Sequence, residues 1–145
     1  MADWIVGPDN PVTARVAVNR IWQKLFGEGI VRSVDYFGER GERPTHPALL
    51  DALALRFVAE GWSQKRLIRA LVLSRTYGMS TAPDSHAESV DPDNRLLWRM
   101  NRRRLDAESL RDAMLAVSGT LLDQQGGPGL PLEYRETPAD SARAT

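Results

Sequence analysis

The chain has no cysteine among its 145 residues. This absence excludes disulfides, thiolate metal sites, cysteine nucleophiles and covalently attached c-type haem, which needs a Cys-x-x-Cys-His motif. The chain also lacks an excess of either charge, because 19 basic side chains balance 19 acidic ones. No overall field therefore draws the molecule to nucleic acid or anionic lipid, and any such binding must come from a local patch.

Long apolar runs are missing as well. No stretch approaches the roughly 18 uncharged residues of a membrane-spanning helix. The first six residues lack the basic start and apolar segment of a secretory signal peptide. We therefore expect no membrane span and no signal peptide in this sequence. With 42% apolar residues, a chain of this length can form an ordinary hydrophobic core without metal or disulfides.

The residues that are present favour an all-α domain. Four segments carry apolar residues at helical spacing, and each follows a residue that favours a helix start. The expected helices begin near Asn10, Pro47, Ser63 and Asp106 and end near Gly27, Gly61, Thr76 and Gly119. A fifth segment, 95–105, fits either a helix or irregular structure. We expect a small irregular helical bundle of about four to five helices with long loops.

One hydrophobic core should join these helices, because the apolar residues recur three or four positions apart on one side of each. The expected core contains Val18, Trp22, Leu50, Leu53, Phe57, Leu67, Leu71, Leu110 and Met114. Residues 31–46 are expected to form a long connection. The segment 78–94 collects Gly, Ser, Pro and Asp and should be a polar surface loop.

Three segments of the chain are similar to one known family. They are 10–22 (NPVTARVAVNRIW), 44–47 (PTHP) and 94–105 (NRLLWRMNRRRL), and the order continues with 108–112 (ESLRD), 117–119 (VSG) and 126–128 (GGP). This pattern resembles a planctomycete domain of unknown function near the C-terminus of large exported proteins, usually behind a cytochrome-c-like domain. The resemblance implies a mainly helical domain in an exported, multi-domain parent, in the periplasm or at the cell surface. The family has no established reaction to transfer.

The resemblance also bears on domain extent. Members of that family usually continue for about a hundred residues beyond the Gly-Gly-Pro, so the resemblance implies that residues 1–123 are a helical domain containing the N-terminal part of the family domain. Residues 124–145 are polar and without periodicity, and we expect a flexible tail there.

Three residues are weak catalytic candidates. His46 stands at an expected helix start after a loop with acidic residues, where a histidine can act as general base, although no histidine spacing supports a metal site. Glu108 and Asp112 lie four residues apart on one helix face, as paired carboxylates do. The structural alternative is that Thr45 or His46 caps the helix and that both acids form ion pairs with Arg104 and Arg111. We expect no metal and no cofactor in this chain.

Residues 95–104 hold five arginines and no acidic residue. Candidates for binding phosphate or stacking on bases are Trp98, Arg99, Arg102, Arg103 and Arg104. Arginine stems also cover apolar surface, and tryptophan is more often a core residue. We therefore expect that at least two of these arginines pair with carboxylates, and nucleic-acid binding is the less favoured alternative.

The leading hypothesis is a module that makes protein or surface-polymer contacts and is not a self-sufficient enzyme. Its partners are expected to be other domains of a larger parent protein or cell-surface components. The alternative is part of a hydrolase-like or metal-dependent site, in which His46, Glu108 and Asp112 converge and other domains complete the site.

Overall fold

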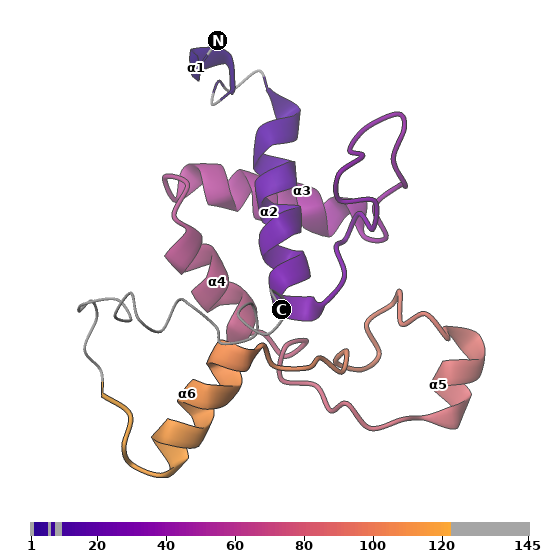
Figure 1. The fold of residues 1–145 in the computed structure, drawn as a ribbon. Coiled ribbons are helices and arrows are strands. Elements are labelled where there is room, and N and C mark those ends of the chain that lie inside the picture. Colours follow the sequence, from indigo (N-terminus) through magenta and orange to yellow (C-terminus); the bar gives the residue numbers. More distant parts are fainter. Residues whose placement is uncertain (1, 6, 8–9, 123–145) are drawn as a thin grey trace, which may run out of the picture. The chain divides into compact units, whose positions relative to one another are not determined.

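The computed structural model describes residues 2–5, 7 and 10–122, and these residues form helices and loops without a strand (Figure 1). The helices are α1 (Ala2–Ile5), α2 (Pro11–Phe26), α3 (Pro47–Ala59), α4 (Gln64–Val72), α5 (Ser85–Val90) and α6 (Ala107–Val117). The expected all-α class is confirmed. The expected flexible tail, 124–145, lies outside the described residues.

The chain divides into two compact units, Met1–Arg103 and Arg104–Thr145. The first unit contains α1 to α5, and the second contains α6. No helix in the described part of the chain is long and apolar enough to cross a membrane.

Helix α2 is the central helix of the first unit, and it packs against α3 and α4 (Figure 1). The side chain of Asn10 caps its start by accepting hydrogen bonds from the N–H groups of Val12 and Thr13, at 3.0 and 3.2 Å. Gly27 ends the helix with φ 93°, a backbone conformation that favours glycine. Both ends of α2 therefore lie where the sequence predicts them.

The core of the first unit contains most of the residues predicted for it. Val18, Trp22, Leu50, Phe57, Leu67 and Leu71 are buried, and Leu53 packs against them. Trp22 also stacks on Phe26, with ring centroids 4.0 Å apart. Leu110 and Met114 do not meet the prediction, because they lie in α6 of the second unit and are 50% and 66% exposed.

A buried asparagine fixes the chain just after α2. Asn19 is fully buried, and its side chain both donates to the carbonyl oxygen of Val31 and accepts from the Val31 N–H, each at 2.9 Å. The backbone of Gly29 lies close to the Asn19 side chain and Val31, and a Cβ at this position would lie 2.4 Å from the Val31 carbonyl oxygen. Because buried backbone groups need hydrogen-bond partners, this clamp holds residues 29–31 against the helix.

The segment 78–94 differs from the polar surface loop that its composition predicts. It contains α5, which Asp84 caps by accepting a hydrogen bond from the Ala87 N–H at 2.9 Å. It ends in a buried turn, since Asp91 and Asn94 are only 8% and 4% exposed. The interpretation of Asp91 as a solvated loop acid is therefore wrong.

In the second unit, Asp106 caps α6 by accepting a hydrogen bond from the Ser109 N–H at 2.7 Å. The helix ends before Gly119, which has φ 73°. Both ends agree with the prediction from the sequence.

Candidate functional site

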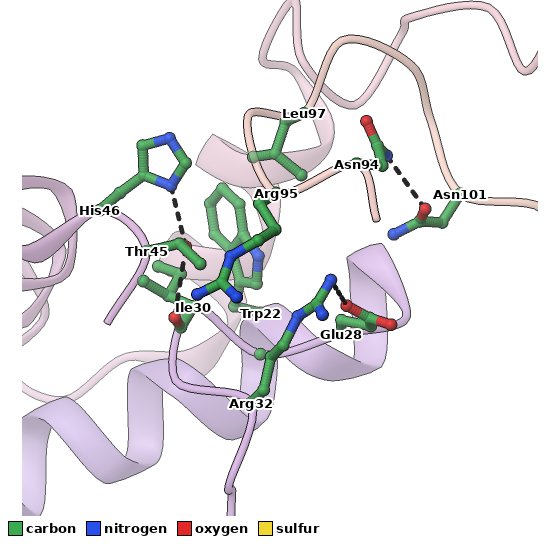
Figure 2. Close-up of a pocket in the computed structure, with 11 residues that line it drawn as sticks. Trp22, Glu28, Ile30, Arg32, Thr45, His46, Asn94, Arg95, Leu97 and Asn101 are labelled. Carbon is green, nitrogen blue, oxygen red and sulfur yellow. Dashed lines mark hydrogen bonds and ion pairs between the residues drawn. The ribbon is translucent and has the colours of Figure 1, made fainter. Parts of the chain in front are cut away.

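A polar crevice on the first unit is lined by segments that lie far apart in the chain (Figure 2). Trp22 comes from α2, Arg32 from the segment that Asn19 fixes, His46 from the start of α3, and Arg95 from the segment after α5. The crevice holds about 20 Å³, which is room for about one water molecule. Only the end of a ligand group can therefore enter it.

The loop that carries Arg95 is fixed by two buried side chains. The Asp91 carboxylate accepts hydrogen bonds from the N–H groups of Arg95 and Leu96, at 2.9 and 2.8 Å. The Asn94 amide donates to the carbonyl oxygen of Arg99 at 2.8 Å and to the side-chain oxygen of Asn101 at 3.0 Å. These bonds fix the backbone of a segment that is neither helix nor strand.

Two residues of this loop have backbone conformations that are unusual for their type. Asn94 has φ 52° and Leu97 has φ 56°. Asparagine tolerates the left-handed region, but leucine has strain there of about 1 to 2 kcal/mol. Such strain persists only where the surroundings fix the backbone, and it gathers at functional sites. Leu97 lines the crevice, so the strained position adjoins the candidate site.

The two arginines of the crevice differ in their partners. Arg32 donates to Glu28 Oε2 at 2.6 Å and to the carbonyl oxygen of Asp93 at 2.8 Å. The Asp93 carboxylate lies 3.6 Å from the same guanidinium group. The Arg95 guanidinium group has no hydrogen bond or ion pair within the described residues, and its side chain extends from the loop into the crevice (Figure 2).

The pKa of Asp91 departs clearly from its ordinary value. Burial raises the pKa of this carboxyl, but the N–H groups of Leu96 and Arg95 and the charges of Arg32 and Arg95 lower it, and the net shift is downward. Asp91 is therefore an ionised structural group that holds the loop.

His46 lies in the crevice wall and begins α3. Its Nδ1 is 3.0 Å from the Thr45 hydroxyl oxygen, and that hydroxyl group donates to the carbonyl oxygen of Ile30 at 3.3 Å. His46 occupies the N-cap position of α3, one of the two residues expected to cap it, but its side chain makes no capping hydrogen bond. The residue belongs to the wall of the crevice instead.

The acidic candidates lie in the other unit. Glu108 and Asp112 are exposed residues of α6, and Arg111 lies 3.6 Å from Asp112. The predicted ion pair between Arg104 and Glu108 is not formed among the described residues. The predicted pairing of Arg111 with an acidic residue of this helix is formed, with Asp112. No group of three acidic, histidine or cysteine side chains in the described residues could hold a metal ion. The shared catalytic site with His46 remains a prediction.

The other candidates at 98–103 contact the protein itself. The Trp98 indole donates to the carbonyl oxygen of Asp91 at 2.9 Å, and the Arg99 guanidinium group lies 5.0 Å from the centre of the Trp98 ring. Arg102 donates to the carbonyl oxygen of Thr81 at 3.4 Å. The Trp98 indole N–H and one contact of its ring are therefore used within the protein.

Arg103 donates to the carbonyl oxygens of Lys24 and Leu25 at the end of α2, a favourable place for a cation. Within the first unit, Arg99, Arg102 and Arg103 thus contact an aromatic ring or backbone carbonyl oxygens, and none of them forms an ion pair there among the described residues. Their pairing with the acidic residues of α6 stays a prediction. Arg104 opens the second unit and is exposed.

A second, larger groove lies along α2 and α3. It holds about 410 Å³ and is lined mainly by apolar side chains, among them Leu55, Val58 and Trp62. Arg15 and Asp51, whose side chains are 2.6 Å apart, link the two helices beside it. The groove has the size of a small-molecule pocket, roughly 300 to 1,000 Å³.

The sequence alone did not single out Arg95 or Arg32. The Asp91-Pro92 pair is a turn signal, but a turn does not show which distant residues its neighbours meet. The contact between residues 32 and 93 spans 61 positions, and no local pattern encodes it.

The described residues thus form a small all-α domain with a polar crevice at its surface. The chain belongs to the family described as "Protein of unknown function (DUF1553)", whose model matches residues 1–144. Comparisons with curated proteins and with solved structures each found no match. The family description assigns no activity, so the function has to be argued from the site.

Proposed function

We propose that this chain is a contact module of an exported, planctomycete-type multi-domain protein, and that it is not a self-sufficient enzyme. The resemblance of residues 10–22, 44–47 and 94–105 supports such a parent, with its cytochrome-c-like neighbour. The partners are other domains of that parent or cell-surface polymers. We take surface polymers as the class to test first.

One observation carries the proposal, namely that these three segments line the same crevice. Trp22, His46 and Arg95 come from positions more than twenty residues apart, and the fold brings them to one small area of the surface (Figure 2). The resemblance to the family rests on the same segments, so the crevice is the best candidate for what the family has in common.

The form of the crevice suits contact with part of a larger molecule. Its volume of about 20 Å³ admits the end of one group, so the body of the partner lies outside. The loop beside it is held by Asp91, Asn94 and Asn101. A rigid, preformed site loses little conformational entropy on binding, which favours recognition of a repeated group on a flexible chain.

The proposal is tested by measuring binding of the full chain to immobilised polymers, with neutral dextran, polygalacturonate and dextran sulfate as probes. Asn101→Ala removes the bonds that close the loop, and Gln64→Ala, an exposed amide on α4, is the matched control. We expect binding to at least one polymer, weakened about fivefold or more by Asn101→Ala, as for one lost hydrogen bond. Binding to none of them, or equal binding by both variants, contradicts the proposal.

A further inference from the structure

We infer that the crevice is a site for a single carboxylate group and that Arg95 is its cationic partner. This inference rests on the proposed contact function and names the chemistry of the ligand. It starts from the difference between the two arginines that line the crevice.

Arg95 is the arginine with free donors. Arg32 is occupied by Glu28 and by both the backbone and the side chain of Asp93. The Arg95 backbone N–H is bound to Asp91 at 2.9 Å, whereas its guanidinium group has no partner within the described part of the chain. A planar guanidinium group with free N–H donors matches the two oxygens of a carboxylate.

The walls of the crevice favour a group with one negative charge. Glu28 lines the crevice together with Arg32 and Arg95, so a ligand anion also meets one fixed carboxylate. A doubly charged phosphate is repelled by that carboxylate more strongly than a singly charged group is. The small volume has the same effect, because the two oxygens of a carboxylate need less room than a tetrahedral phosphate or sulfate ester.

Two polar groups on the other walls are already used within the protein. The Thr45 hydroxyl group donates to Ile30, and the Asn101 amide donates to the carbonyl oxygen of Phe26 at 3.0 Å. Arg32 is occupied as well, so recognition of the ligand's charge depends on Arg95. A free organic acid and an acidic residue of a polymer present the same group, and the probes below distinguish these two sources.

The experiment is calorimetric titration of the full chain at low salt with glucuronate, with oligogalacturonate and with the methyl ester of oligogalacturonate. The methyl ester keeps the hydroxyl groups of the oligomer and removes its charge. Arg95→Gln is compared with Arg99→Gln. Both variants lose one positive charge from the same loop, but the Arg99 side chain lies against Trp98 instead. The melting temperature of each variant shows that it remains folded.

We expect oligogalacturonate to bind to the wild-type chain and its methyl ester not to bind. Arg95→Gln should weaken binding about tenfold or more, as expected for a lost hydrogen bond to a charged group, and Arg99→Gln less than about twofold. Equal affinity for glucuronate identifies a free acid as the ligand, and a clear preference for the oligomer identifies the polymer; both support a carboxylate site.

Three results overturn the inference. They are equal losses in the two variants, binding of the methyl ester, and tighter Arg95-dependent binding of dextran sulfate, which assigns the site to a sulfate ester. A chain that binds a polymer without dependence on Arg95 contradicts only this inference. A chain that binds no polymer at all contradicts the proposed contact function as well.

Discussion

The side chain of Asn94 donates a hydrogen bond to the side chain of Asn101, 3.0 Å away, and so closes the loop that carries Arg95. Asn101 in turn donates to the carbonyl oxygen of Phe26, 75 positions earlier, at the end of α2. The two asparagines therefore join an irregular loop to the central helix.

Asn94→Ala should destabilise the protein more than Asn94→Gly. Both substitutions remove the hydrogen bonds of the amide, but only alanine has an unfavourable side chain at φ 52°. The difference in unfolding free energy should be about 0.5 to 1 kcal/mol. Urea denaturation of the two variants measures it, and equal stabilities would show that the backbone at this position relaxes.

Asn19→Ala should lower the unfolding free energy by about 2 to 4 kcal/mol, because it leaves the buried N–H and carbonyl groups of Val31 without partners. The neighbouring substitution Arg20→Ala is the control. Arg20 lies 3.8 Å from Asp35 in an exposed pair, so its loss should cost less than about 1 kcal/mol. A similar effect of both substitutions would mean that water replaces the clamp.

Asp91 should make the stability of the protein depend on pH. Because its pKa is lowered in the folded state, the charged carboxylate contributes stability above the ordinary aspartate pKa. This contribution is lost as the pH falls from the ordinary aspartate pKa through the lower pKa that Asp91 has in the folded protein. The stability difference between the wild-type chain and Asp91→Asn should therefore be greatest near neutral pH and shrink below about pH 4. Chemical denaturation at a series of pH values tests this, and a constant difference argues against it.

Nucleic acid should bind only weakly. Arg102 and Arg103 donate to backbone carbonyl oxygens, and the net charge of the chain is zero. Titration with DNA and RNA at about 0.15 M salt should give dissociation constants in the non-specific range, roughly 10⁻⁴ to 10⁻⁶ M. Salt-dependent nanomolar binding that is lost in a folded variant with Arg102, Arg103 and Arg104 changed to alanine would establish a nucleic-acid module.

The starts of the helices are predictable because their signals are local. Asn10, Ser63 and Asp106 each cap the helix that follows them, and a cap depends only on neighbouring residues. The apolar spacing likewise predicts most of the first unit's core. The sequence predicts α6 equally well, but it does not show that Leu110 and Met114 lie in a second unit.

The candidate site was less predictable because distant residues form it. His46 was singled out by residue type, and it does lie in the crevice wall. In the sequence, Arg95 is one of five arginines in residues 95–104. Arg103 donates to carbonyl oxygens at the end of α2 and Arg95 does not, and this difference depends on which carbonyl oxygens the fold brings within reach. The burial of Asp91 is not predictable from the composition of residues 78–94, because burial by distant segments leaves no periodic pattern.

The most direct test of the account is to map the bound polymer by NMR. The signals to follow in the full chain during titration with oligogalacturonate are the arginine Nε–H groups and the backbone N–H groups. The account predicts that the largest shifts occur at Arg95, Arg32 and Thr45, which line the crevice, while Arg102 and Arg103 remain nearly unchanged. Shifts that gather on Arg102 and Arg103, or the absence of any shift at Arg95 under saturation, would contradict it.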